Sequence, residues 1–195
     1  MSRPNRDSYH HGDARNALLA AATSLIEGVG AQGLSLRQVA EKAQLSRQAP
    51  YNHFADKEAL LAELVRGGFA RLESQIRRVK GYPGGATALE RAAEAYIGFA
   101  QQAPALFRLM FSRELVDLSR FPEAAAAAAA SFASLTAIVA TLTTPDRVDE
   151  VSLAAWCLVH GYATLCIETG LEGESRRAQR ARLFARIIRG DANGS

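Results

Sequence analysis

The chain has 195 residues, of which 48% are hydrophobic and 22% charged, and its mean hydropathy is −0.07. These values exclude a disordered chain and are typical of a soluble globular protein with one domain or two small ones. Its 23 Lys and Arg residues against 20 Asp and Glu residues exclude a polybasic, histone-like protein, yet they permit a local basic patch for nucleic acid.

The two cysteines, Cys157 and Cys166, are spaced so that they fall on opposite faces of a helix, which disfavours a mutual disulfide. Reduced thiols are typical of a cytoplasmic protein. The N-terminal part contains no signal-peptide hydrophobic core, and only an alanine-rich stretch approaches the length and apolarity of a membrane span. We therefore expect a cytoplasmic protein with no membrane partner.

The predicted elements begin after a polar segment, residues 1–12, which we expect to be a flexible arm. A helix follows from Asp13, its N-cap, and an apolar stripe continues it to the glycine-rich stretch 28–33. A short second helix begins after Ser35, which forms a capping-box pattern with Gln38.

Further helices follow the turn at 44–46. A third, short helix is expected over 47–54, and a longer fourth helix begins after its N-cap Asp56 and ends before GYPGGA at 81–86. Five more helical stretches are predicted at 87–102, 104–117, 122–142, 146–170 and 174–189. Because no stretch alternates apolar and polar residues as a strand does, we predict an all-α fold of about nine helices.

The third predicted helix carries a polar face that suits DNA. Arg47, Gln48 and Asn52 have side chains that can form bidentate contacts with base edges in the major groove. Tyr51 and His53 can donate hydrogen bonds to phosphates. Two short helices joined by a turn, with such a face on the second, are the requirements of a helix-turn-helix reader. Composition alone does not exclude an alternative, in which this segment is a solvated polar face on an ordinary helical hairpin.

Residues 13–60 resemble the N-terminal DNA-binding domain of tetracycline-repressor-like (TetR) transcription regulators. The resemblance lies in LSLRQVAEKAQLS (34–46) and most specifically in YNHFADKEALL (51–61). YHHGD (9–13) and WCLVHG (156–161) are similar to a subgroup whose C-terminal domain is named for a Trp-His-Gly (WHG) pattern. The resemblance implies a three-helix N-terminal helix-turn-helix domain and a helical C-terminal domain that dimerises and binds a small molecule.

Carried over by position, the resemblance implies that Arg47 and Gln48 face bases and that other polar residues hold phosphates. The predicted DNA-binding residues are Ser35, Arg37, Ser46, Arg47, Gln48, Tyr51, Asn52, His53 and Lys57. Two positions depart from the family pattern, because Gln48 stands where many members have glycine and Pro50 where many have a branched or aromatic apolar residue. Since a proline removes one backbone hydrogen bond, we expect the third helix to be short or loose before it binds DNA.

The stretch 146–170 is apolar on two faces, with one seam that includes Leu165 and another that includes Leu153. We expect one face to meet the core of its own domain and the other to meet a twin subunit, with 174–189 as the companion helix. The alternative is a central helix wholly inside one monomer. The dimer is favoured because helix-turn-helix proteins usually bind paired half-sites.

A pocket for a small molecule would need an apolar lining with a few polar groups. The candidate ligand-binding residues are Tyr96, Phe99, Phe107, Met110, Phe111, Trp156 and His160. Aromatic residues at helical spacing are equally typical of a packed core, so this alternative stays open for each of them. Two potential ligands, Cys157 and His160, do not complete a zinc site.

GVGAQG at 28–33 matches the dinucleotide-binding pattern, but a helix rather than a strand precedes it, so no cofactor is expected. No catalytic or metal-binding constellation is present in the sequence, and we predict that the protein is not an enzyme. The predicted domains are a flexible arm (1–12), a helix-turn-helix domain (13–58) and a helical ligand-binding and dimerisation domain (59–190).

The sequence therefore predicts a DNA-binding transcription regulator, in our interpretation a repressor. It would bind a palindromic double-stranded DNA operator as a homodimer and leave it when a small-molecule effector binds. One alternative is a helical small-molecule-binding protein or enzyme that acts without DNA. Another is a helix-turn-helix used for protein contacts, for which an apolar rather than a polar face would be expected.

Overall fold

The computed structural model describes residues 6–79, 85–171 and 176–192. Its helices are α1 (Arg6–Gly33), α2 (Leu36–Lys42), α3 (Lys57–Arg78), α4 (Gly85–Gln102), α5 (Pro104–Met110), α6 (Pro122–Val139), α7 (Val148–Thr169) and α8 (Arg177–Ala192). Short 3₁₀ turns are η1 (Pro50–Asn52), η3 (Leu118–Arg120) and η4 (Pro145–Arg147). No strand occurs in these three stretches, which confirms the all-α prediction; the α-helices in them number eight.

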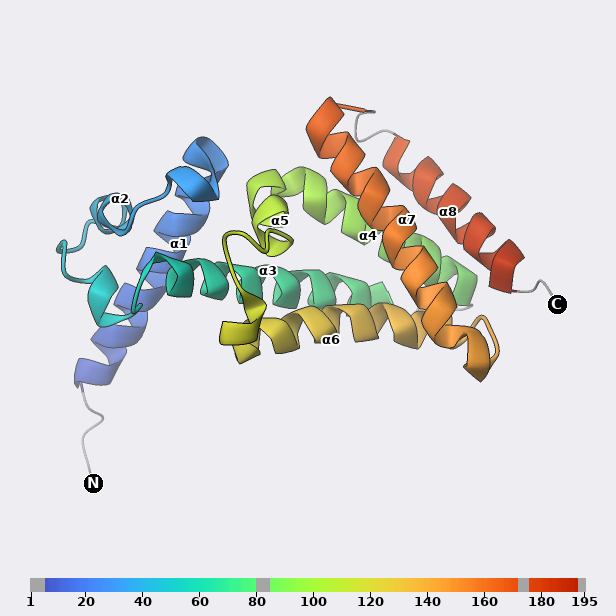
Figure 1. Cartoon of the computed structure of the whole chain (residues 1–195), viewed down its shortest axis with the longest axis horizontal. Coiled ribbons are helices and arrows are strands. Elements are labelled where there is room, and N and C mark those ends of the chain that lie inside the picture. Colours follow the sequence, from blue (N-terminus) through green and yellow to red (C-terminus); the bar gives the residue numbers. More distant parts are fainter. Residues whose placement is uncertain (1–5, 80–84, 172–175, 193–195) are drawn as a thin grey trace, which may run out of the picture. The chain divides into compact units, whose positions relative to one another are not determined.

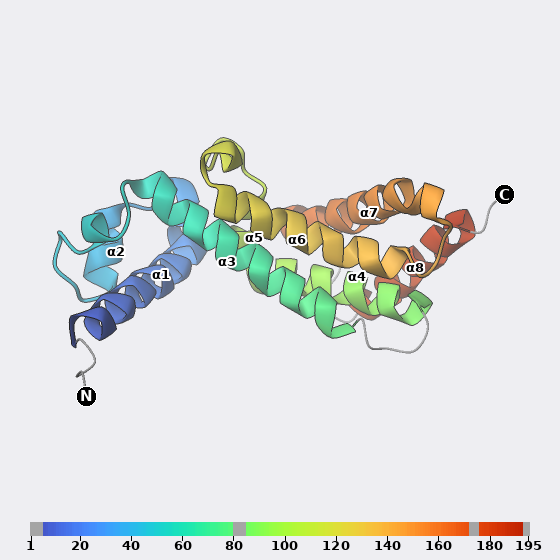
Figure 2. The same ribbon diagram turned by 90° about the horizontal axis from the view of Figure 1, so that it is seen from below.

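The chain forms two compact units. The first contains residues 1–66 and 105–124, and the second contains 67–104 and 125–195. The predicted division after residue 58 stays a prediction about function. Figures 1 and 2 show the elements of each unit in two views.

In the first unit, α1 lies beside α2 (Figure 2) and buries one stripe that includes Leu18, Ala22 and Ile26. The helix predicted from Asp13 begins earlier, at Arg6, so it includes residues 6–12 of the expected arm, whose flexibility stays a prediction; residues 1–5 lie outside the described part. No proline follows Pro4 until well beyond this segment, so nothing in residues 6–12 interrupts a helix. The helical geometry is broken at Gly30, whose φ of 71° favours glycine.

The predicted capping box at α2 is present. The Ser35 hydroxyl accepts from the Gln38 backbone N–H at 3.3 Å, and the Ser35 backbone N–H donates to Gln38 Oε1 at 2.9 Å. The helix buries Leu36, Val39 and Ala40. The turn after it places Gln44 at a φ of 57°, so the chain reverses sharply before the next segment.

The helix predicted over 104–117 is shorter than expected, since α5 ends at Met110 and i→i+3 turns follow it. Two carboxylates hold this segment within the first unit. Glu27 of α1 accepts hydrogen bonds from the backbone N–H groups of Ala105 and Leu106, at 3.3 and 3.4 Å, and so caps α5. Glu58 accepts from the backbone N–H of Asp117 at 3.1 Å and forms an ion pair with Arg120.

In the second unit, α4 packs against α7 and α8, which lie side by side (Figure 1). Small residues on α4, including Ala88, Ala92 and Ala93, are buried and let these helices approach closely. On α7 the buried stripe recurs every four residues and consists of Val151, Ala155, Val159 and Ala163.

Some other apolar side chains of α7 are exposed to solvent, whereas Cys166 is buried and Trp156 is half-buried. Leu153 is 58% exposed and Leu165 is 52% exposed, whereas the neighbouring helix α8 has Ile187 at 51%. One face of α7 therefore fills the core of its own unit, and a second apolar face has no partner within the described residues. The two predicted seams do not match these faces, because Leu153 and Leu165 were placed on different seams and are both exposed.

Two helices, α6 and the stretch Pro145–Thr169 that contains α7, are long and apolar enough to cross a membrane by length and composition. Core helices of soluble proteins meet the same criterion. Within the described residues, 28% of the α6 window and 33% of the Pro145–Thr169 window are buried.

Candidate DNA-binding face and effector cavity

The segment that follows the turn at 44–46 is not the α-helix predicted over 47–54. The backbone instead forms consecutive i→i+3 turns, including Ala49 N–H to Ser46 O at 3.0 Å and His53 N–H to Pro50 O at 3.0 Å, with η1 at its centre. The physical reason is Pro50, which has no N–H to donate to the carbonyl of Ser46, so an α-helical turn cannot close there. The expectation of a short helix is confirmed, its 3₁₀ geometry was not predicted, and its looseness before DNA binding stays a prediction.

The polar residues of this segment face outward. Arg47, Gln48 and Asn52 are exposed, and Tyr51 is 55% exposed. The face rests on buried side chains from the same segment, chiefly Phe54, which is 4% exposed. Groups of the kinds that can contact bases and phosphates are thus presented to solvent on an apolar anchor, as a DNA-contacting element requires.

The other predicted DNA-binding residues have different surroundings. Arg37 on α2 and Ser46 are exposed, and His53 is half-buried. The Ser35 hydroxyl is engaged in capping α2. The Lys57 ammonium donates to the backbone carbonyl of Gln32 at 2.6 Å, so it ties the end of α1 to the start of α3.

A network that sequence patterns did not indicate supports this face from within the first unit. Arg15 of α1 forms an ion pair with Glu63 of α3 at 2.6 Å, and its guanidinium lies over the Phe54 ring at 5.5 Å. Burial tends to raise the pKa of Glu63, but hydrogen bonds from Arg15 and Arg66 outweigh it and lower that pKa. Arg15 and Glu63 are far apart in sequence, and no motif links them.

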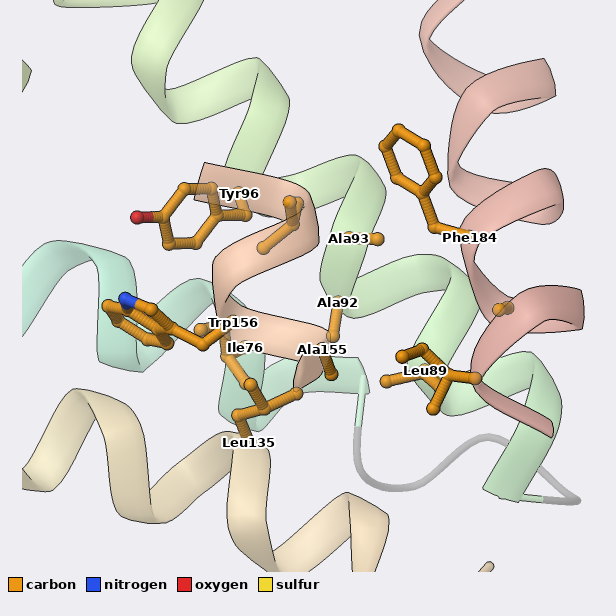
Figure 3. Close-up of a pocket in the computed structure, with 12 residues that line it drawn as sticks. Ile76, Leu89, Ala92, Ala93, Tyr96, Leu135, Ala155, Trp156 and Phe184 are labelled. Carbon is orange, nitrogen blue, oxygen red and sulfur yellow. The ribbon is translucent and has the colours of Figure 1, made fainter. Parts of the chain in front are cut away.

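The second unit contains an apolar cavity, shown in Figure 3. Its lining comes from α3, α4, α6, α7 and α8 and consists of Ile76, Leu89, Ala92, Ala93, Tyr96, Leu135, Ala155, Trp156, Val159, Phe184, Ala185 and Ile188. The rings of Tyr96 and Trp156 lie on one side and the ring of Phe184 on the other. The cavity volume is 20 Å³, room for about one water molecule, so a larger ligand must move side chains.

The structure brings three of the predicted ligand-binding residues together. Tyr96 and Trp156 line the cavity with their ring centroids 5.2 Å apart, and the Tyr96 hydroxyl is 2.9 Å from Nδ1 of His160. Phe99 is buried on another face of α4, under the guanidinium of Arg71.

Phe107, Met110 and Phe111 belong to the first unit and do not line this cavity. The rings of Phe107 and Phe111 are 5.1 Å apart, and Phe107 is 2% exposed. Sequence reasoning missed lining residues such as Leu135 and Phe184, because apolar residues at helical spacing carry no signal that separates a cavity wall from a core.

The hydroxyl of the lining residue Tyr96 is engaged with His160, which is not itself a lining residue. Burial raises the pKa of Tyr96 and lowers the pKa of His160, so both groups are neutral near pH 7. None of the twelve lining residues is charged. The cavity can therefore accept an apolar molecule once side chains move, but it offers no counter-charge.

The lowered pKa of His160 predicts a pH dependence of stability. Between that pKa and the ordinary value of 6.5, the unfolded chain binds more protons than the folded one. Above pH 6.5, neutral His160 makes its full contribution to the free energy of unfolding. This contribution is lost as the pH falls from 6.5 through the lowered pKa of His160. We expect the melting temperature to fall on acidification from about pH 7.5 to about pH 5.5, and to fall less in His160→Gln.

The control for this measurement is His53→Gln, which removes a histidine from the other unit and shows how much of any change follows from the loss of a histidine as such. Thermal melts followed by circular dichroism at each pH measure the difference. An equal fall in the unmutated protein and in His160→Gln would contradict the assignment of the effect to His160.

Comparisons with known proteins agree with this geometry. Residues 18–64 match the family model described as bacterial regulatory proteins of the tetR family, and residues 89–190 match the tetracyclin repressor-like C-terminal domain. A search of curated proteins gave no match.

Solved structures show the same fold. A protein of unknown function from Rhodococcus sp. RHA1 is 31% identical, covers 91% of this chain and 96% of its own, and has a TM-score of 0.74. The TetR-family regulator PfmR from Thermus thermophilus is 20% identical over 88% of this chain and 96% of its own, with a TM-score of 0.68. FadR from Bacillus subtilis, solved with stearoyl-CoA, is 12% identical over 92% and 98%, with a TM-score of 0.72.

The C-terminal match alone spans more than half of the chain, and the N-terminal match covers the helix-turn-helix segment whose exposed polar face is described above. The assignment to a subgroup with a Trp-His-Gly pattern stays a prediction. The chain belongs to the TetR family of DNA-binding transcription regulators.

Proposed function

We propose that this TetR-family regulator is a cytoplasmic repressor that binds a palindromic operator as a homodimer and is released by a small, uncharged, apolar effector. Members of this family are regulators and not enzymes. The observation that carries the proposal is the exposed face of Arg47, Gln48, Tyr51 and Asn52, anchored by the buried Phe54.

The proposed dimer uses the second apolar face of α7 together with α8. Leu153, Cys157, Gly161 and Leu165 recur every four residues and share this face, and Ile187 of α8 is exposed as well. A two-fold axis would bring the same helices of two chains together and bury these side chains in an isologous interface. Paired helix-turn-helix units would then meet two half-sites, about 34–36 Å apart for successive turns of DNA.

The proposed effector class follows from the lining of the cavity. A carboxylate or an ammonium group buried among the twelve uncharged residues would have no counter-ion, and its desolvation would oppose binding. An apolar molecule with one hydroxyl or carbonyl group could hydrogen-bond to the Tyr96–His160 pair. The solved complex of FadR with stearoyl-CoA shows that a protein of this fold holds a small molecule.

The proposed coupling is a population shift. Residues 57–66 of α3 belong to the first unit and 67–78 to the second, and cavity residue Ile76 lies on this same helix. An effector that prefers one of two positions of α3 would change operator affinity by its differential binding, typically ~1–3 kcal/mol of coupling. The long helix is therefore the proposed lever.

In vitro selection of the purified protein against a random DNA duplex library tests the DNA-binding part. We expect a palindrome to be recovered, which then serves as the probe for variants. Arg47→Ala should weaken binding by ~1–3 kcal/mol and relax the base preference, because it removes a base contact. Tyr51→Phe should weaken binding to all sequences alike, because it removes a phosphate contact.

Fluorescence anisotropy at several salt concentrations measures the operator affinity of both variants. Arg186→Gln in α8 of the second unit is the matched control for the loss of one cation. Binding that stays unchanged in Arg47→Ala and Tyr51→Phe would contradict the placement of the DNA-binding face. A folded protein that enriches no sequence, with or without apolar compounds, would favour a small-molecule-binding role without DNA.

A further inference from the structure

The guanidinium of Arg177, the first residue of α8, lies directly against the backbone of Gly98 on α4. A Cβ atom added at Gly98 would stand 3.0 Å from Nη1 of Arg177 and 3.4 Å from its Cζ. The absence of a side chain at position 98 is therefore what leaves room for the guanidinium in this position.

Two nitrogens of this guanidinium are buried without a partner. Neither Nε nor Nη1 of Arg177 has a hydrogen-bond acceptor, although both are shielded from solvent. An arginine stays protonated in a protein, so the group cannot lose its charge to relieve the burial. Arg177 as a whole is half-buried, so the cost lies in these two shielded nitrogens, and unsatisfied buried groups of this kind call for a partner that is not one of the described residues.

A cleft of 350 Å³ opens beside Arg177 in the second unit. Its lining comprises Gln75, Val79, Arg91, Glu94, Ala95, Gly98, Phe99, Gln102 and Arg177. The carboxylate of Glu94 is already engaged by Arg91 at 3.0 Å. Arg71 adds a further positive charge nearby, since its guanidinium lies over the Phe99 ring and 3.5 Å from Gln102 Oε1.

The charges of the cleft therefore favour an anion. With Glu94 neutralised by Arg91, the charge of Arg177 is left over, and the neighbouring Phe99 and Val79 provide apolar surface. This cleft is separate from the cavity of Figure 3, whose lining shares none of these residues.

We propose that this cleft is an anion-binding site, in which the carboxylate or phosphate group of a small molecule pairs with the buried guanidinium of Arg177. The site links α3, α4 and α8 of the second unit and stands independently of the proposed operator and effector. Carboxylate and phosphate share the chemistry that an arginine recognises, which is a planar or tetrahedral oxyanion with several acceptor oxygens.

The test uses the full-length protein with sodium phosphate, sodium acetate and sodium chloride at matched ionic strength and pH. We expect phosphate or acetate to raise the melting temperature in a saturable way, while chloride does not, and the anion that saturates at the lower concentration identifies the class. Titration calorimetry with that anion then gives the affinity. In Arg177→Gln the affinity should fall at least tenfold.

Two further variants separate the site from a general effect of charge. Arg186→Gln removes an exposed arginine from the same helix and should bind the anion as the unmutated protein does. Gly98→Ala keeps every charge but displaces the guanidinium with one methyl group, so it should weaken binding several-fold. This second variant keeps the proposal testable if Arg177→Gln does not fold, which circular dichroism shows.

Three results would overturn the proposal. One is the absence of a saturable effect of phosphate or acetate in the unmutated protein. Another is equal affinity in the unmutated protein, Arg177→Gln and Gly98→Ala. The third result concerns the double variant Glu172→Gln with Glu174→Gln. If this variant is less stable than the unmutated protein and binds anions more tightly, a carboxylate of the chain itself is the partner of Arg177.

Discussion

Replacing Leu153 and Leu165 together by glutamate is expected to convert the proposed dimer into monomers and to remove specific operator binding. Both leucines are more than half exposed on one face of α7, so the unpaired chain should fold normally. In a two-fold interface each substitution enters twice, and four buried carboxylates without counter-ions would oppose association. Operator affinity should fall by about 10²–10⁴-fold, because each half-site would then be bound independently.

Analytical ultracentrifugation at micromolar concentration and anisotropy on the selected operator measure the two effects. Val29→Glu is the control, since Val29 is 48% exposed on α1 in the first unit and gains one of the two charges that the double variant gains. It should leave both association and operator affinity nearly unchanged. A dimer that persists in the double variant would place the interface on another surface.

Phe107→Ala is expected to lower the free energy of unfolding of the first unit by about 3–5 kcal/mol. The Phe107 ring is 2% exposed and packs against Phe111, and its removal leaves a cavity that the surrounding helices fill only in part. Phe111→Ala should cost less, because this second ring is only half-buried. Neither change touches the apolar cavity of the second unit, so the affinity of an effector that binds there should hardly change.

Urea unfolding followed by two probes checks this expectation. Circular dichroism reports all helices, whereas fluorescence of Trp156, the one tryptophan in the sequence, reports the second unit. The circular-dichroism transition of Phe107→Ala should move to lower urea more than the fluorescence transition does. Loss of effector binding without loss of stability would instead support the original interpretation of Phe107 as a ligand-binding residue.

The elements whose ends carry local chemical signals could be predicted from the sequence. The capping-box pair Ser35 and Gln38 indicates the start of α2, and Pro104 and Pro122 are the first residues of α5 and α6. The segment around Pro50 was harder, because its amino acids favour a helix while one missing N–H decides its geometry. A short helix could be predicted there, whereas the 3₁₀ turns depend on backbone hydrogen bonds that the sequence does not specify.

The candidate sites could be predicted where one short segment carries them. Arg47, Gln48 and Tyr51 lie within a few residues of one another, so the polar face was visible in the sequence. The cavity draws its wall from five helices, and an apolar residue such as Phe184 has the same sequence signal in a wall as in a core. Long-range pairs such as Arg15 with Glu63 are likewise invisible without the fold.

The attachment of 105–124 to the first unit bears on how freely regulators of this fold can exchange their parts. A fusion that joined residues 1–66 to a foreign sensor would leave Glu27 without the start of α5 and Glu58 without Asp117 and Arg120. Recombination at a single crossover in α3 would thus leave two carboxylates, those of Glu27 and Glu58, without the groups that they bind. A transplantable DNA-binding module has to carry both segments of the chain, or it has to bring replacements for the groups that these carboxylates bind.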